Sequence, residues 1–202
     1  MNKSSGFSMI EVLVALLITM VGLLGIAALQ VKAQQAEMES YQRAQALIIM
    51  SDIVDRINVN RSTVSCFFIT TNTTAGTPFM GVAGSGHMAT PPSCSASTPT
   101  YNSQAEAAIV ELDNLLEGAA ETLAGADVVN VGAMIGARAC ISYDASSEIG
   151  GSAGTGLITV VVSWQAMGDL APPTANCANG LYGAETKRRA VSTSFRIANL
   201  FG

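Results

Sequence analysis

Charged residues are scarce in this chain, and basic residues are the scarcer kind. Asp, Glu, Lys and Arg make up 12% of the 202 residues, and the formal net charge is −5. That charged fraction is about half of the ~25% usual in globular domains. The only cluster of basic residues is Lys187–Arg189, so a nucleic-acid partner has little electrostatic support. A body rich in Gly, Ala, Ser and Thr suggests instead an exported protein with a weakly charged surface.

Metal-binding patterns are also missing. The four cysteines contain no C-x-x-C pair and His87 is the only histidine, so we expect no zinc site, no other metal and no cofactor. An even, widely spaced set after an export-like start predicts two disulfides, for which three pairings exist. We favour Cys66–Cys94 and Cys140–Cys177, because each closes a short loop. Four reduced, buried cysteines are the alternative.

Proline is absent between Gly6 and Asn58, and residues 30–57 also lack glycine. Residues 12–29 are eighteen apolar residues without a charge, the lower limit for a membrane-spanning helix. Lys3 precedes this run, which predicts a cytoplasmic N-terminus and a body outside the membrane. We expect one helix over residues 8–58, roughly 75 Å long. Its second half has an apolar stripe and a polar face, composed of Leu47, Met50, Val54 and Ile57 and of Gln42, Gln45, Asp52 and Arg56, respectively.

The remaining residues predict an α+β body. Residues 60–100 form a Thr-, Ser-, Gly- and Pro-rich loop that a Cys66–Cys94 bridge would staple. Ser103 and Glu106 fit a capping box, which predicts an amphipathic helix from Ser103 to Gly125. Four strand-like segments follow without helical patterns between them, which favours an antiparallel sheet with the helices on one face. These segments are residues 127–132, 137–144, 156–166 and 187–198.

A glutamate, Glu11, stands at the start of the apolar run. A secretory signal peptide would have a shorter core and a clear small-residue cleavage site, whereas 26–28 is a marginal one. A plain membrane anchor fits the run but gives no reason for Glu11 or for the preceding Gly6-Phe7 step. Gly6–Leu16, GFSMIEVLVAL, resembles the class III signal of type IV pilins and pseudopilins. The resemblance implies the pilin fold, a long N-terminal α-helix packed on an antiparallel sheet.

The same resemblance implies processing. In that family a prepilin peptidase cuts after the glycine, here between Gly6 and Phe7, and methylates the new amino group. That ammonium and the Glu11 carboxylate are four residues apart, and each needs a partner in an apolar environment. We therefore expect Glu11 to pair with the ammonium of a neighbouring subunit, and so to set the stagger between helices. The expected parts are the leader 1–6, the apolar half-helix 7–29, the amphipathic half-helix 30–59 and the periplasmic domain 60–202.

Further features narrow the resemblance to one kind of pilin. Major pilins usually carry a proline in the apolar helix, where this chain has Gly22 and Gly25. The first sixty residues, and more loosely Leu157–Trp164, Cys177 and Arg188-Arg189, are similar to PilV-like minor pilins. That resemblance implies that the protein is not an enzyme. It implies a structural subunit that primes pilus assembly and lies near the pilus tip. It implies location in the inner membrane, then in the pilus.

The implied partners are other minor pilins, the major pilin, the prepilin peptidase, the assembly machinery of the inner membrane and a tip adhesin. A GspI-like minor pseudopilin of a type II secretion system is the nearest alternative, although such chains are usually shorter. A membrane-anchored periplasmic binding protein or enzyme is a more distant one.

Other candidates have plainer interpretations. His87 lies in a glycine-rich, exposed-looking loop. A catalytic histidine needs a nucleophile and an orienting partner, and because serines are frequent throughout this chain, we interpret those near His87 as coincidental. Asp144, Ser146 and Glu148 lack the spacing of a calcium loop and predict a turn after a strand. We expect Trp164 in the core. Lys187–Arg189 are expected at a solvated start of the last strand.

Overall fold

The computed structural model describes Gly6 and residues 8–90, 92–118, 122–123, 129–130, 134–150, 152 and 154–198. The chain divides into two compact units, residues 1–41 and 42–202, and each is described by itself. Helix α1, Met9–Val59, runs from the first unit into the second and confirms the helix expected over 8–58. Gly22 and Gly25 do not interrupt it.

The second half of α1 buries most of the stripe that its sequence predicts: Ile57 is buried, and Met50 and Val54 are partly buried and pack against the core. Its buried residues are Gln42, Ala46, Ile53 and Ile57. Leu47 was assigned to the buried stripe but is 45% exposed, and Gln42 was assigned to the polar face but is 6% exposed. The packed face thus keeps Met50, Val54 and Ile57 of the predicted stripe but includes Ala46 in place of Leu47.

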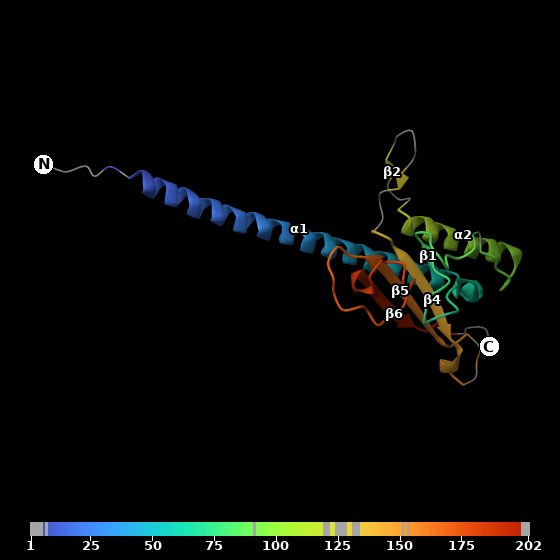
Figure 1. Ribbon diagram of the computed structural model, residues 1–202. Helices are drawn as coiled ribbons and strands as arrows, with labels where there is room; N and C mark the ends of the chain where they lie inside the picture. The colour runs from blue at the N-terminus through green and yellow to red at the C-terminus, as the bar shows by residue number, and fades with distance from the viewer. Residues whose placement is uncertain are drawn as a thin grey trace. The chain divides into compact units, whose positions relative to one another are not determined.

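A four-stranded antiparallel sheet forms the centre of the second unit (Figure 1). Its order is β1, Met80–Gly81; β4, Arg138–Asp144; β5, Leu157–Gln165; and β6, Arg188–Phe195. The three longer strands confirm the segments expected at 137–144, 156–166 and 187–198. Cys140 opposes Val161 on β5, and Val162 opposes Val191 on β6. Strand β1 was not expected, because two residues inside a polar loop carry no periodic signal.

The second helix begins and ends earlier than its sequence predicts. Helix α2 is Pro99–Leu116, with Thr98 at the N-cap position and proline at the first turn. The expected capping box at Ser103 is therefore wrong: its Oγ donates to the carbonyl of Thr100 at 2.9 Å. Gly118, at φ +87°, follows the C-terminus, and Leu123, expected in the helix, lies in a strand.

A small two-stranded pair follows α2. Strand β2, Thr122–Leu123, pairs with β3, Val129–Asn130. The strand expected at 127–132 contains β3, and its other residues lie outside those described. Three short 3₁₀ helices complete the described elements: η1, Arg61–Phe67; η2, Ala145–Ser147; and η3, Glu185–Lys187.

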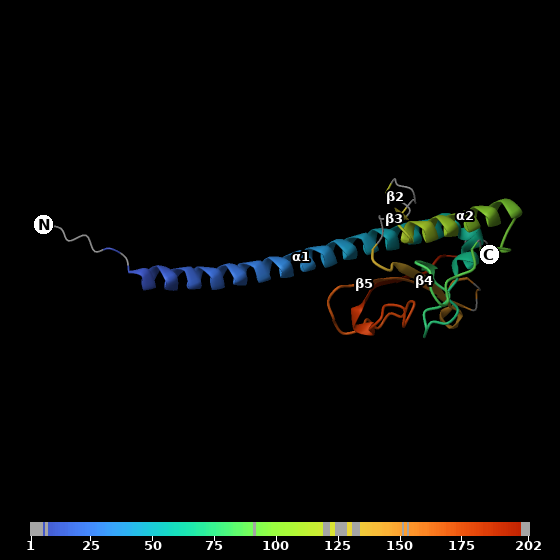
Figure 2. The same cartoon turned by 45° about the horizontal axis from the view of Figure 1, so that its top comes forward.

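The sheet separates two cores. Alternate residues of β5, Ile158, Val160, Val162 and Trp164, pack with the buried residues of α1 and α2. On the opposite face, Val161 packs with Phe79, Cys140, Cys177 and Tyr182. Figure 2 shows α2 and the end of α1 on one side of the sheet, and the segment between β5 and β6 on the other. The α+β fold expected from the sequence is confirmed: a long N-terminal helix with an antiparallel sheet, as in type IV pilins.

Candidate functional site

The start of α1 carries the residues that the sequence marks for processing and assembly. Gly6 is exposed, and Phe7 lies outside the described residues. Ser8 begins the helix by accepting the backbone N–H of Glu11 at its carbonyl, 3.1 Å, and at its Oγ, 3.3 Å. Glu11 is exposed and occupies the first turn, where the positive end of the helix dipole favours a carboxylate. An exposed carboxylate here is available to a group from another molecule.

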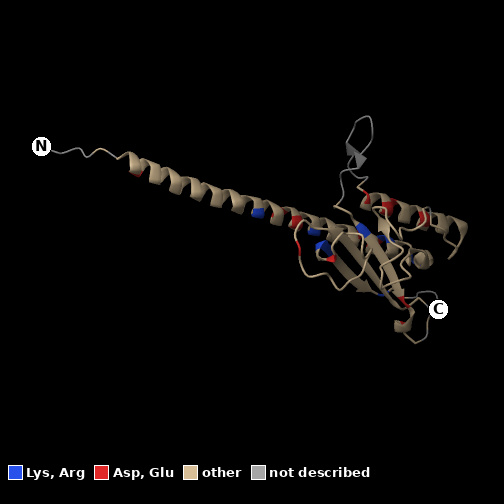
Figure 3. Ribbon diagram, in the orientation of Figure 1, with Lys and Arg blue, Asp and Glu red and all other residues tan. Residues whose placement is uncertain are grey.

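An uncharged apolar surface follows Glu11. Of the described helices, α1 alone is long and apolar enough to cross a membrane; its most apolar 18-residue window has a mean hydropathy of 2.8, with none of it buried in the structure. Positions 12–31 of α1 contain no charged residue, and Figure 3 shows a long stretch of the N-terminal half of this helix without blue or red. An exposed apolar surface of this extent marks a site of interaction with lipid or with other apolar chains.

Two disulfides staple the second unit, and they join the cysteines in the favoured pairing. Cys66 of η1 bonds Cys94, with a Cα–Cα distance of 5.4 Å. The backbone N–H of Cys94 donates to Glu106 Oε1 at 2.7 Å, which ties this loop to α2. Glu106, expected to cap its own helix, therefore fixes the stapled loop instead.

The second disulfide fixes the segment that covers the outer face of the sheet. Cys140 on β4 bonds Cys177, with a Cα–Cα distance of 5.6 Å, and both are buried. Gly76 packs against this bridge with φ +67°, and a Cβ there would lie 2.4 Å from the Cα of Cys177. Only glycine fits such a position without displacing backbone.

Arg188 also holds this segment, the chain between β5 and β6, in place through hydrogen bonds. It was expected at a solvated strand start but is 2% exposed. Its Nε donates to Glu185 Oε2 at 2.6 Å, and its other nitrogens donate to the carbonyls of Ala175 and Pro173. The pKa of Glu185 is lowered: burial opposes its ionisation, but the N–H of Gly180 and the Arg188 guanidinium outweigh that effect. The cation is buried because the segment supplies these oxygens, a partnership that sequence spacing does not reveal.

A buried polar group lies beside the second disulfide. Ser163 and Tyr182 share a hydrogen bond of 2.7 Å between their hydroxyls. Burial raises the pKa of Tyr182, although Ser163 and Arg138 oppose the shift. The Arg138 guanidinium stacks over the rings of Phe79 and Tyr182 at 5.4 and 5.1 Å. These contacts are satisfied within the body, so the group holds the fold and presents nothing reactive.

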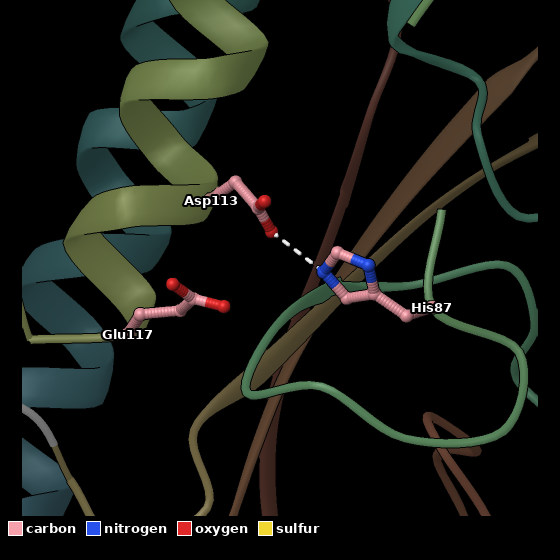
Figure 4. A group of neighbouring side chains, drawn as sticks. All are labelled: His87, Asp113 and Glu117. Atoms are coloured by element: carbon pink, nitrogen blue, oxygen red, sulfur yellow. Dashed lines mark hydrogen bonds and ion pairs between the residues drawn. The ribbon is translucent and has the colours of Figure 1, made fainter. Parts of the chain in front are cut away.

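His87, Asp113 and Glu117 form a cluster that the sequence did not predict. Gly84–Gly86 are exposed, as expected of this loop, but His87 itself is partly buried and packs against Phe79. Its Nε2 lies 3.1 Å from Asp113 Oδ1, which also accepts the N–H of Gly81 at 2.6 Å. Figure 4 shows both carboxylates turned toward the imidazole. A separation of 26 residues conceals this contact from any sequence pattern.

The remaining candidates match their plainer interpretations. Asp144 caps η2 by accepting from the N–H and Oγ of Ser146, which makes a turn after a strand. Glu148 accepts from the hydroxyl of Tyr143 at 2.5 Å. Trp164 is 2% exposed in the core, and its Nε1 has no hydrogen-bond partner among the described residues.

The sequence matches two models of known protein families. Residues 1–27 match the family model of the prokaryotic N-terminal methylation motif. Residues 28–106 match the family model described as type IV pilin Tt1218. No curated protein and no solved structure matches significantly. The two adjoining matches and the fold support a pilin or pseudopilin, a class of structural proteins that associates with pilus components and a prepilin peptidase. The motif and the apolar helix together suggest membrane anchoring and pilus assembly.

Proposed function

We propose that this chain is a PilV-like minor pilin, a structural subunit without catalytic activity that helps to initiate type IV pilus assembly and sits near the pilus tip. One observation carries the proposal: a methylation motif with an exposed Glu11 leads, without a break in α1, into a region that matches a type IV pilin. The absence of proline between Gly6 and Asn58 argues against a major subunit.

Processing follows from the motif. A prepilin peptidase cuts between Gly6 and Phe7, removes residues 1–6 and methylates the new amino group. Residues 7–29 then hold the subunit in the inner membrane, residues 30–59 join this segment to the body, and residues 60–202 form the periplasmic domain. After assembly, the first of these segments packs among the helices of other minor pilins and the major pilin.

Glu11 sets the axial register between neighbouring helices in this assembly. An ionised carboxylate costs roughly 2.5–3.5 kcal/mol at the centre of a bilayer on insertion scales. Pairing with the ammonium of a neighbouring Phe7 offsets that cost only when two helices have the correct stagger. The exposure of Glu11 in the first turn of α1 supports this role.

The intact mass of the chain extracted from membranes tests the processing. Loss of residues 1–6 together with one added methyl group is the expected result. An uncleaved chain contradicts the pilin proposal, because no amino group then forms on Phe7 to pair with Glu11. A cut near residue 28 contradicts it as well, because it removes Glu11 together with the apolar helix.

Incorporation into pili tests the register role. Glu11→Ala should leave membrane insertion intact and remove the subunit from sheared pili, whereas Glu37→Ala, an exposed glutamate of the same helix, should incorporate normally. Equal incorporation of both variants contradicts the register role of Glu11. It does not contradict cleavage between Gly6 and Phe7, which the mass measurement tests separately.

The GspI-like pseudopilin is the second candidate, supported by the same methylation motif. The stapled segment between η1 and α2 and the second disulfide favour the PilV-like function, because GspI-like chains are usually shorter. Cross-linking in cells that have both systems separates the two: capture of minor pilins, the major pilin or a tip adhesin supports the first, and capture of secretion pseudopilins supports the second.

A further inference from the structure

We propose that His87, Asp113 and Glu117 form a binding site for a divalent transition metal ion, with zinc the best fit. The three side chains offer one imidazole nitrogen and two carboxylate oxygens, all within 4.8 Å of one another. His, Asp and Glu are all established zinc ligands, and a three-residue set leaves a fourth position for water. The proposal concerns the body alone and is independent of the role in pilus assembly.

The geometry is close to a coordinated one. Ligand atoms about 2.0–2.1 Å from a tetrahedral zinc lie about 3.3 Å apart. The distance from His87 Nε2 to Asp113 Oδ1 is 3.1 Å, so both atoms can bind one ion with little movement. Glu117 is the C-cap residue of α2 and partly buried, and its carboxylate is turned toward His87 (Figure 4), with a ligand oxygen within 4.8 Å of the other two ligand atoms.

The electrostatics of the cluster call for a cation. Asp113 and Glu117 are like charges at i and i+4, which repel each other on one helix face. They also stand at the C-terminus of α2, where the helix dipole disfavours anions, and the last turn of this fully described helix contains no Lys or Arg. Within the described part of the chain, the Glu117 carboxylate has no hydrogen-bond partner. A metal ion would neutralise the negative potential of the Asp113 carboxylate, the Glu117 carboxylate and the C-terminal end of the α2 dipole.

The surroundings hold the ligands in place. The N–H of Gly81 donates to Asp113 at 2.6 Å, and the edge of Phe79 supports the imidazole. Outer contacts of this kind orient the ligands of metal sites. Imidazole favours zinc, nickel or copper, whereas calcium takes six to eight oxygens and no nitrogen. The ion would link the segment that contains β1 to the end of α2.

Calorimetric titration of the full chain, in detergent and without a histidine tag, with zinc chloride tests the site. One ion per chain is expected to bind saturably; Glu117→Gln should weaken binding at least about tenfold, and His87→Gln should abolish saturable binding. Asp55→Asn, an exposed carboxylate on α1, is the matched control and should bind as the unaltered chain does. Absence of saturable binding, or equal binding by Glu117→Gln, overturns the proposal and leaves a simple His87–Asp113 hydrogen bond.

A second measurement reports the coordinating atom directly. Because His87 is the only histidine, its imidazole gives one pair of ¹⁵N resonances. Zinc should shift the Nε2 resonance strongly and the Nδ1 resonance weakly, since Nε2 is the atom that faces Asp113. No shift of Nε2 on saturation with zinc also overturns the proposal, even where a variant fails to fold.

Discussion

The two disulfides should contribute unequally to stability, although they close loops of similar length. Their sequence separations are 28 and 37 residues. The chain-entropy relation assigns them about 3.6 and about 3.8 kcal/mol at 25 °C, respectively. The environments differ more: Cys140 and Cys177 are 2% and 0% exposed, whereas Cys66 and Cys94 are only partly buried.

Replacing each pair with alanine should expose that difference. Removing one buried heavy atom costs about 0.5–1.5 kcal/mol, so the loss of two sulfur atoms and of the entropic part should cost the Cys140→Ala/Cys177→Ala variant roughly 5–7 kcal/mol in all. The Cys66→Ala/Cys94→Ala variant should lose about 3.6 kcal/mol, the entropic part alone.

Urea unfolding of the full chain in detergent measures both losses through the fluorescence of Trp164. This residue is the only tryptophan and is buried beside both helices, so its emission reports the body. Equal losses from the two variants would refute the argument from burial. A larger loss from the Cys66–Cys94 pair would also refute the ranking by loop length.

Three further perturbations test the body in the same unfolding assay. Ile53→Ala should cost about 2–4 kcal/mol and Leu47→Ala less than about 1 kcal/mol, because only the first is buried; the reverse order would restore the stripe read from the sequence. Gly76→Ala should cost roughly 3 kcal/mol or more, because it adds strain at positive φ and a clash with the Cys177 backbone; a neutral effect contradicts the close approach. The folded-state pKa of Glu185 lies below its unfolded value, so its stabilising contribution is present above the ordinary pKa of 4.5 and is lost as the pH falls through the lower folded value. A Glu185→Gln variant should therefore show a flatter decline of stability below pH 4.5 than the unaltered chain, and parallel curves would contradict the shift.

Long periodic elements could be predicted from the sequence, and contacts between distant segments could not. Helix α1 and strands β4, β5 and β6 have continuous patterns that tertiary contacts do not override. The start of α2 was missed because Pro99, read as part of a loop, is also favoured in a first helical turn. The buried face of α1 is predicted only in part, because periodicity gives the spacing of a stripe but not the burial of residues at its edge, such as Leu47 and Gln42.

The candidate sites also differ in whether a local sequence pattern or only a contact between distant segments reveals them. The motif at Gly6, Phe7 and Glu11 is local, so fixed spacing in one short stretch is sufficient to suggest it. The His87 cluster and the buried Arg188 depend on partners that folding brings together, and composition alone favours a solvated role for each. Burial of a polar or charged side chain is decided by its partners, which is why the sequence did not indicate the buried position of Arg188 or the inward turn of His87.

The exposed part of α1 sets the energy scale on which a role for Glu11 must be judged. Fifteen large apolar side chains between Met9 and Val31 are 46–93% exposed. Completing their burial in lipid or among other helices is worth on the order of 20 kcal/mol, against roughly 3 kcal/mol for an unpaired carboxylate. Glu11 therefore cannot decide whether this segment associates with an apolar environment. The proposed register role is consistent with this scale, because one-turn shifts between helices would leave the apolar contact nearly unchanged while they make or break a single charge pair.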